Sequence, residues 1–186
     1  MNRLSATLLA LLLSLPALAD NPKVELKTSQ GRMVLTLYPD QAPKTVENFL
    51  GYLQSGHYDG TIFHRVIAGF MIQGGGYDPD LKKRQTRAPI PNEADNGLRN
   101  ERGTIAMART NDPHSATAQF FINHRANPFL DHRNKTPRGW GYAVFGRLIE
   151  GENVLDAIAR MPVGRQGTMN NAPKETVTIL SAKLLP

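Results

Sequence analysis

The stretch FHRVIAGFMIQGGG, residues 63–76, sets an arginine among short apolar runs and ends in three successive glycines. The runs 61–66 and 70–73 are rich in β-branched and aromatic side chains, which predicts two strands with Gly69 between them. Arg65 is the unusual member, because a guanidinium in an apolar stretch must find an acceptor or face a cleft. The stretch therefore predicts either a structural ion pair or a functional site at Arg65.

The segment upstream of this stretch predicts a hairpin and a helix. Two alternating runs, 24–28 and 33–38, are separated by SQGR, which is typical of a β-hairpin. A helix is expected to begin near Pro43 and to end at Gly56. Its apolar side chains recur with helical spacing at Val46, Phe49, Leu50 and Leu53.

The segment downstream adds strands, one helix and a long loop. Four further strands are predicted at 104–108, 119–123, 142–149 and 175–184. The apolar spacing of 152–161 predicts a second amphipathic helix. Residues 77–102 are rich in charge, proline and asparagine, and a structureless loop of that length is usually functional.

The order of these elements predicts a mainly β protein. About eight strands and two helices without regular alternation argue against a parallel doubly wound sheet. We expect a closed eight-stranded antiparallel β-barrel, because closure removes exposed strand edges, with the two α-helices capping its ends.

Residues 1–19, MNRLSATLLALLLSLPALA, have the layout of a secretory signal peptide. Arg3 supplies a positive n-region, an apolar run follows, and ALA precedes a cleavage site before Asp20. The apolar run is well short of the roughly 20 residues that a membrane-spanning helix needs. We expect cleavage to leave 20–186 as one domain; an uncleaved anchor or a buried N-terminal helix is the alternative.

The composition excludes several classes of chemistry. The chain has no cysteine, which excludes disulfide scaffolds, thiolate zinc sites and cysteine nucleophiles. The five histidines lack the spacing of metal ligands, so we expect no metal and no cofactor. The net charge of +6 leaves a nucleic-acid binder as an alternative. The basic cluster Lys82, Lys83, Arg84 and Arg87 has no interleaved aromatic residue, however, and predicts a solvated loop.

The apolar side chains near Arg65 predict a pocket without a nucleophile. Four apolar walls and a rim of one guanidinium and two amides would come from Phe70, Met71, Phe121, Leu130, Arg65, Gln73 and Gln119. Taken singly, each aromatic residue is also explained by core packing. The assembled pocket suits a reaction that makes no bond, such as peptide-bond rotation, whose barrier is about 18–20 kcal/mol. A guanidinium directed at the proline nitrogen would stabilise the twisted state more than the planar one.

Four blocks of the chain resemble the cyclophilin family of peptidyl-prolyl cis–trans isomerases: FHRVIAGFMIQGGG, NEADNGLRNERGTIAMART, ATAQFFI and YAVFGRLIEG. With the predicted signal peptide, the chain is most similar to the exported cyclophilins of Gram-negative bacteria. The resemblance implies an eight-stranded barrel with two helices and isomerase activity on X–Pro bonds. It makes Arg65 and Gln73 the candidate catalytic residues. It assigns substrate binding to Phe70, Met71, Ala108, Arg109, Gln119, Phe121, Phe129, Leu130 and Tyr142.

Three positions depart from the family pattern. Arg109 stands where eukaryotic relatives commonly have asparagine, so we expect its role to come from its backbone. Phe129 replaces a tryptophan of many relatives, and Tyr142 replaces a pocket histidine. The last two changes predict weak cyclosporin binding rather than lost catalysis.

The leading interpretation is an exported isomerase that acts on unfolded or newly exported proline-containing polypeptides. A cyclophilin-like module that binds proline segments without turnover is the alternative. We expect a periplasmic monomer with no nucleic-acid partner and no membrane association after cleavage. A cysteine-free protein suits the periplasm because it folds without disulfide machinery.

Overall fold

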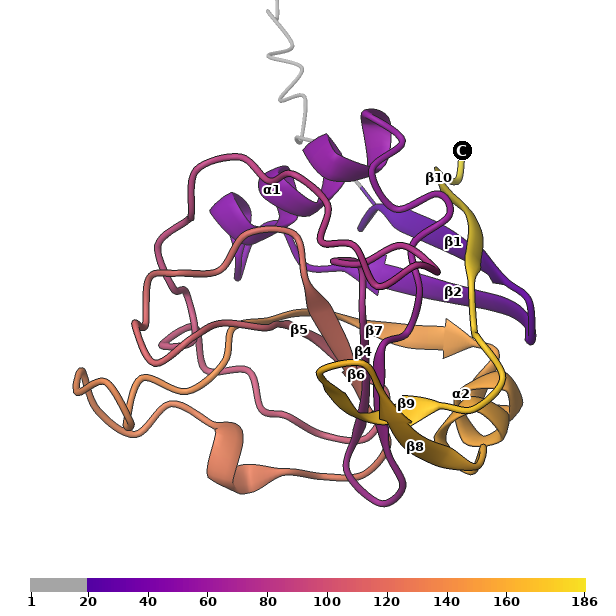
Figure 1. The fold of residues 1–186 in the computed structure, drawn as a ribbon. Coiled ribbons are helices and arrows are strands. Elements are labelled where there is room, and N and C mark those ends of the chain that lie inside the picture. The colour runs from indigo at the N-terminus through magenta and orange to yellow at the C-terminus, as the bar shows by residue number, and fades with distance from the viewer. Residues whose placement is uncertain (1–19) are drawn as a thin grey trace, which may run out of the picture.

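The computed structural model of the protein describes residues 20–186. The predicted signal peptide, 1–19, lies outside the described residues. Figure 1 shows a strongly curled sheet with a long irregular segment on one side and a helix on each of two sides.

The main sheet has eight strands in the order β10-β1-β2-β7-β5-β6-β4-β3, and every neighbouring pair is antiparallel. The predicted mainly β class is therefore confirmed. The strands are β1 (Lys23–Thr28), β2 (Gly31–Leu37), β3 (Arg65–Ile67), β4 (Met71–Gly74), β5 (Thr104–Met107), β6 (Phe120–Asn123), β7 (Val144–Glu150) and β10 (Ile179–Leu184).

The sheet is a curled half-barrel, and the predicted closed barrel is wrong in this respect. Its two outer strands, β3 and β10, do not pair with each other; the segment before β3 meets the start of β10 at the isolated bridge between Ile62 and Thr178. The predicted strand 61–66 begins at Arg65 instead, because the residues before Arg65 form one isolated bridge, between Ile62 and Thr178, and not a continuous ladder. Three backbone bonds join the edges there: Gly60 N to Ile179 O (2.8 Å), Ile179 N to Thr61 O (2.7 Å) and Phe63 N to Val177 O (2.9 Å).

Both predicted helices are present. α1 (Pro43–Gln54) begins with the proline whose fixed φ suits a first turn. It inserts Phe49 among three aromatic rings, at centroid distances of 5.0 Å to Tyr58, 5.7 Å to Phe120 and 5.2 Å to Phe145. α2 (Glu152–Ala159) ends two residues before the predicted boundary and packs beside β2, β3 and β4.

Three elements were missed by the sequence patterns. β8 (Val163–Gln166) and β9 (Met169–Pro173) form a separate two-stranded hairpin, and β9 lies beside β3. Their residues are mostly polar or small, so they give no apolar alternation. The 3-10 helix η1 (Pro128–Leu130) follows β6. The predicted loop 77–102 is confirmed, since it carries only isolated bridges.

Candidate active site

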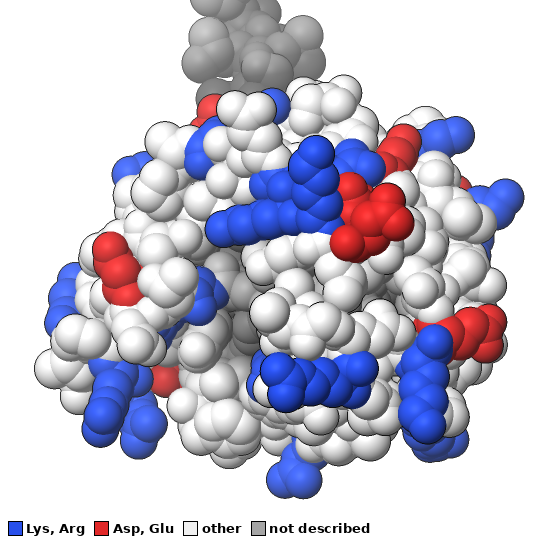
Figure 2. All heavy atoms as spheres, in the orientation of Figure 1, with Lys and Arg blue, Asp and Glu red and all other residues white. Residues whose placement is uncertain are grey.

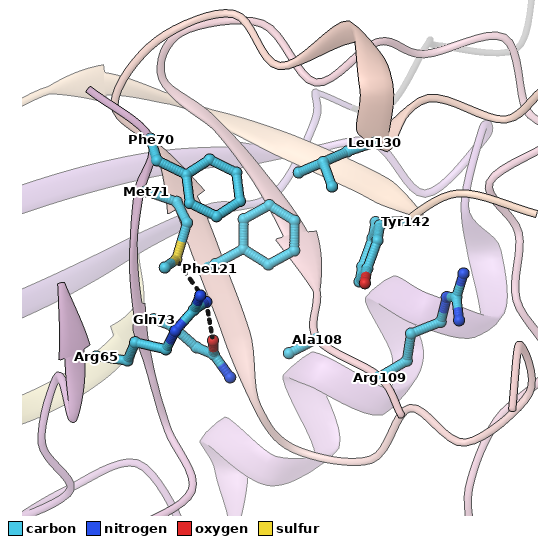
Figure 3. A pocket seen from close by; sticks show the side chains of 9 residues that line it. All are labelled: Arg65, Phe70, Met71, Gln73, Ala108, Arg109, Phe121, Leu130 and Tyr142. Atoms are coloured by element: carbon cyan, nitrogen blue, oxygen red, sulfur yellow. Dashed lines mark hydrogen bonds between the residues drawn. The ribbon is translucent and has the colours of Figure 1, made fainter. Parts of the chain in front are cut away.

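A cavity of about 140 Å³ opens where β3, β4 and β6 meet the loops that follow β5 and β6. This volume is well below the roughly 300–1,000 Å³ of sites that enclose drug-sized ligands, so it suits a single side chain of a polypeptide. Figure 3 shows the nine residues that line it: Arg65, Phe70, Met71, Gln73, Ala108, Arg109, Phe121, Leu130 and Tyr142. The structure therefore brings together nearly all of the residues predicted for the site.

Strand register explains why the polar and apolar parts of the site face each other. Arg65 on β3 pairs with Gln73 on β4, and Gln73 pairs with Phe121 on β6. Residues paired across neighbouring strands point to the same face of a sheet. This row of three strands therefore carries a guanidinium, an amide and an aromatic ring on one face, as Figure 3 shows.

The floor of the cavity is a small apolar cluster that is distinct from the main core. Met71, Phe121 and Leu130 are buried in it together with Ala106 and Val144. Phe70 and Tyr142 pack against this cluster while remaining partly exposed. The ring of Tyr142 meets that of Phe121 edge-on, with centroids 5.6 Å apart. An apolar ring placed here would contact side chains on several sides.

Arg65 carries a charge that no acid of the described residues neutralises. Within residues 20–186, no carboxylate lies within salt-bridge distance of its guanidinium. Its Nη1 lies 3.4 Å from Gln73 Oε1 and 4.0 Å from Met71 Sδ, and its Cζ lies 5.9 Å from the ring centroid of Phe70. These are weak, neutral contacts, so the structural ion pair left open by the sequence is absent from the described chain. The guanidinium retains N–H donors for a ligand.

Gln119 and Phe129 do not line the cavity. Gln119 accepts a bond from Gln73 Nε2 at 3.0 Å, which orients the amide that faces Arg65. It also lines a second hollow of about 230 Å³ that shares Gln73, Ala108 and Arg109 with the cavity, so the two form a continuous groove. Phe129 is 59% exposed and stacks on Phe70 at 5.6 Å, outside the cavity.

Buried amides hold the two apolar walls together, and the sequence patterns missed them. Asn127, only 1% exposed, donates from Nδ2 to Phe70 O at 3.0 Å and to Asn123 Oδ1 at 2.7 Å. Its own carbonyl accepts from Leu130 N at 2.9 Å. Asn127 thus links the turn that carries Phe70 to the 3-10 helix that carries Leu130. The segment INHRAN contains these polar residues, but nothing in its pattern indicates that they are buried.

His124 supports the same turn. Its Nδ1 accepts from Gly69 N at 2.9 Å, so its Nε2 carries the proton that is shared with Asp156 Oδ1 at 3.0 Å. The guanidinium of Arg102 binds the same carboxylate oxygen at 2.8 Å. Hydrogen bonding from Arg102, in first place, lowers the pKa of Asp156. The turn before β4 is therefore anchored to α2.

His64, the neighbour of Arg65, faces the other way. It is 4% exposed, its ring lies 4.7 Å from that of Tyr77, and its Nδ1 has no hydrogen-bond partner in the described structure. Burial lowers the pKa of His64 from 6.5 to about 4. His64 is therefore neutral near pH 7, and Arg65 keeps the only charge of this pair.

Two arginines of the basic cluster in the long loop contact the protein and are not fully solvated. Arg84 donates to His57 O at 3.2 Å, and Arg87 donates to Gly51 O at 2.9 Å and lies over the ring of Tyr52. Figure 2 shows basic side chains on the displayed face in separate groups rather than in one continuous stripe. In residues 20–186 no group of three or more histidine, aspartate or glutamate side chains could hold a metal ion. No helix of that part is long and apolar enough to cross a membrane.

Comparisons with known proteins agree with the fold and identify the family. The family model described as cyclophilin type peptidyl-prolyl cis-trans isomerase/CLD matches residues 23–184. A peptidyl-prolyl cis-trans isomerase, cyp18, of Streptomyces antibioticus is 64% identical over 162 residues, covering 87% of this chain and 98% of its own length. Peptidyl-prolyl cis-trans isomerase B of Escherichia coli K12 is 52% identical over 158 residues, covering 85% and 96%.

A third relative and a solved structure extend this agreement. A peptidyl-prolyl cis-trans isomerase of Acinetobacter baylyi is 49% identical over 184 residues, covering 99% of this chain and 96% of its own. The crystal structure of a Cryptosporidium parvum cyclophilin in the presence of the dipeptide Ala-Pro superposes with a TM-score of 0.75 at 28% identity, covering 88% of this chain and 99% of that one. The curled sheet, the apolar cavity beside Arg65 and these matches over almost the whole described chain show that the protein belongs to the cyclophilin-type peptidyl-prolyl cis–trans isomerases.

Proposed function

We propose that the cavity beside Arg65 is where this isomerase turns X–Pro bonds, and that its clients are unfolded or newly exported polypeptides. The proline ring would enter the apolar cluster of Met71, Phe121 and Leu130. The polypeptide on either side would lie along the groove that continues past Gln73 towards Gln119. The Ala-Pro dipeptide named with the Cryptosporidium cyclophilin supports this class of ligand.

The proposed mechanism is electrostatic. Rotation removes amide resonance and leaves a lone pair on the proline nitrogen, and uncatalysed X–Pro bonds take tens of seconds or longer. Turnover in milliseconds requires about 10⁴-fold acceleration, or roughly 5–6 kcal/mol. An Arg65 N–H directed at that nitrogen binds the twisted state more strongly than the planar one, which is the condition for catalysis. Gln73 would hold the guanidinium in place and Gln119 would hold Gln73.

The observation that carries this proposal is that, within residues 20–186, no acid neutralises Arg65. A guanidinium that only stabilised the fold would normally have its N–H groups bonded to an acid or to backbone carbonyls, whereas Arg65 makes only two long contacts, with Gln73 and Met71. It also argues against the alternative of a binding module without turnover, which needs no cation at the rotating nitrogen.

The test compares Arg65→Ala and Arg65→Lys with wild type in an isomerase assay on a proline peptide. We expect Arg65→Ala to lose at least about 10²-fold in kcat/KM, roughly 3 kcal/mol, the scale for one preorganised donor. Lysine should rescue poorly because it lacks the planar fork. Arg165→Ala, at an exposed position in β8, is the matched control and should leave activity unchanged. Turnover near wild type in Arg65→Ala would contradict the mechanism. A wild-type protein that binds the peptide but does not accelerate its isomerisation would favour the binding module.

Export is a separate part of the proposal. We propose that 1–19 directs the chain to the periplasm, is removed there, and leaves a monomer that begins at Asp20. Mass spectrometry of the exported protein should give the mass of 20–186, and analytical ultracentrifugation should give a single species of that mass. Recovery of Met1 in the exported protein would contradict cleavage.

A further inference from the structure

The side chain of Arg109 is held by three backbone carbonyls. Its Nε donates to Gly141 O at 2.9 Å, its Nη2 to Pro137 O at 3.1 Å and its Nη1 to Thr110 O at 2.8 Å. Two of these acceptors belong to the irregular segment that leads from η1 to Tyr142. Arg109 therefore ties the end of β5 to that segment through its side chain, whereas the sequence pattern had predicted a role for its backbone alone.

The same guanidinium supports a wall of the cavity. Its Cζ lies 4.7 Å from the ring centroid of Tyr142, within the range of a cation–π contact. The ring of Tyr142 in turn meets Phe121 edge-on, with an angle of 76° between the planes. Figure 3 shows Tyr142 with Arg109 on one side and the apolar floor on the other. The ring is thus held between a cation and the residue that would contact the proline ring.

Only an arginine makes this set of contacts. In residues 20–186, Arg109 has no carboxylate partner, so its charge is balanced by carbonyl dipoles and by the π-face of Tyr142. The planar fork directs its N–H groups to fixed acceptors while its face stays free to stack. A lysine ammonium cannot do both. The tyrosine and the arginine are the two departures from the family pattern that touch each other.

We infer that Arg109 is a positioning residue that acts through Tyr142 and sets the width of the apolar cavity. The inference rests on the proposed function of that cavity. Arg109 would influence how well the proline ring is bound and not how strongly the twisted nitrogen is stabilised, which is the task of Arg65. Removing the side chain should therefore change KM more than kcat.

The experiment measures KM and kcat on a proline peptide for Arg109→Ala, Arg109→Lys, Tyr142→Ala and the double variant Arg109→Ala/Tyr142→Ala. We expect Arg109→Ala to raise KM about tenfold with kcat within about threefold of wild type, a change on the scale of one lost cation–π contact. Arg109→Lys should resemble Arg109→Ala. Arg138→Ala, exposed in the same segment, is the matched control and should behave as wild type.

The double variant separates action through Tyr142 from direct contact with the substrate. If Arg109 acts through the ring, the double variant should raise KM no more than Tyr142→Ala alone. Independent, multiplying effects would overturn the inference, and so would wild-type KM in Arg109→Ala or full rescue by lysine. Chemical denaturation of each variant checks that it is folded at the assay temperature. If Arg109→Ala is unfolded, the test uses the lysine variants instead: KM of Arg109→Lys/Tyr142→Ala is compared with KM of Arg109→Lys and of Tyr142→Ala. These outcomes do not depend on the result for Arg65→Ala. Wild-type turnover in Arg65→Ala would contradict the proposed function itself.

Discussion

Phe120 and Phe121 are neighbours on β6 and serve opposite faces of one sheet. Phe120 is fully buried in the main core, where its ring lies 5.5 Å from Tyr58 and 6.1 Å from Phe63. Phe121 is also buried, at 4% exposure, but it forms the floor of the cavity. The alternation of a strand therefore divides two identical side chains between a closed core and an open site.

The same division separates His64 from Arg65. The histidine is buried beside Tyr77 and neutral, while the arginine faces the cavity with its charge unpaired. One face of the sheet is packed for stability, and the other is left partly unfilled for a ligand. Burial alone does not distinguish the two faces, since Phe121 is almost as inaccessible as Phe120. What differs is whether the space next to the side chain is already occupied.

The largest effect is expected for Phe120→Ala. Truncating a fully buried aromatic ring leaves a cavity that its neighbours cannot close. The free energy of unfolding should therefore fall by about 3–5 kcal/mol. Urea denaturation measures this change. Below its melting range the variant should keep kcat/KM within about fivefold of wild type, because the site lies on the other face. A large loss of activity in the folded variant would show that the two faces are not separable.

Phe121→Ala should show the reverse ranking. We expect it to cost at least about 1 kcal/mol less stability than Phe120→Ala, because its space opens into the cavity and water can enter. Its kcat/KM should fall by at least about tenfold, since the proline ring loses its floor. Denaturation and the peptide assay on the same preparation give both numbers. Equal stability losses in the two variants would contradict the division between a closed core at Phe120 and an open site at Phe121.

His64→Gln tests the burial of His64, the core-facing member of the His64–Arg65 pair, through the pH dependence of stability. Burial lowers the pKa of His64 from 6.5 to about 4, so the unfolded chain binds this proton more readily than the folded one. Wild type should therefore lose stability as the pH falls from 6.5 towards 4, by about 2–3 kcal/mol from this group. The difference between wild type and His64→Gln in urea midpoints should change across that window and level off below it. A constant difference would contradict the shift.

The smallest effect on catalysis is expected at the exposed rim. We propose that cyclosporin binds weakly because Phe129 cannot donate the indole N–H that a tryptophan at this position would offer, which would leave an acceptor without a partner at a cost of about 1–3 kcal/mol. Phe129→Trp should bind cyclosporin roughly 5- to 150-fold more tightly by calorimetry. Its kcat/KM on short peptides should change by less than about threefold, because residue 129 stacks outside the cavity. Equal cyclosporin affinity in wild type and Phe129→Trp would show that the missing indole N–H donor does not weaken binding.

The site could be predicted from the sequence to a large extent because its residues lie in recognisable blocks. Arg65 was conspicuous as a charge among apolar neighbours, and the motif resemblance placed Phe121, Leu130 and Tyr142 around it. The structure confirms that these side chains meet. Helix α1 was also predictable, since proline at its first position and apolar spacing agree.

Other features depend on contacts that a sequence pattern does not contain. The closed barrel failed because closure requires a ladder between β3 and β10, and the segment before β3 forms only the isolated bridge between Ile62 and Thr178. The side-chain role of Arg109 depends on Pro137 and Gly141, which only the folded chain brings near. Asn127 is polar yet buried, and its partners lie on a different turn. In each case the deciding partner is distant in the sequence.

The pairing of β1 with β10 makes the first and last strands of the domain neighbours. Val24 pairs with Leu184, and Leu185 N donates to Lys23 O at 2.8 Å. A chain synthesised from its N-terminus therefore holds β1 with one unpaired edge until β10 has emerged. Long-range pairing of this kind slows folding and leaves the edge open to other strands in the meantime. The sheet is therefore complete only once β10 has formed, and joining the adjacent ends of β1 and β10 with a short linker would permit new termini to be opened in a surface loop.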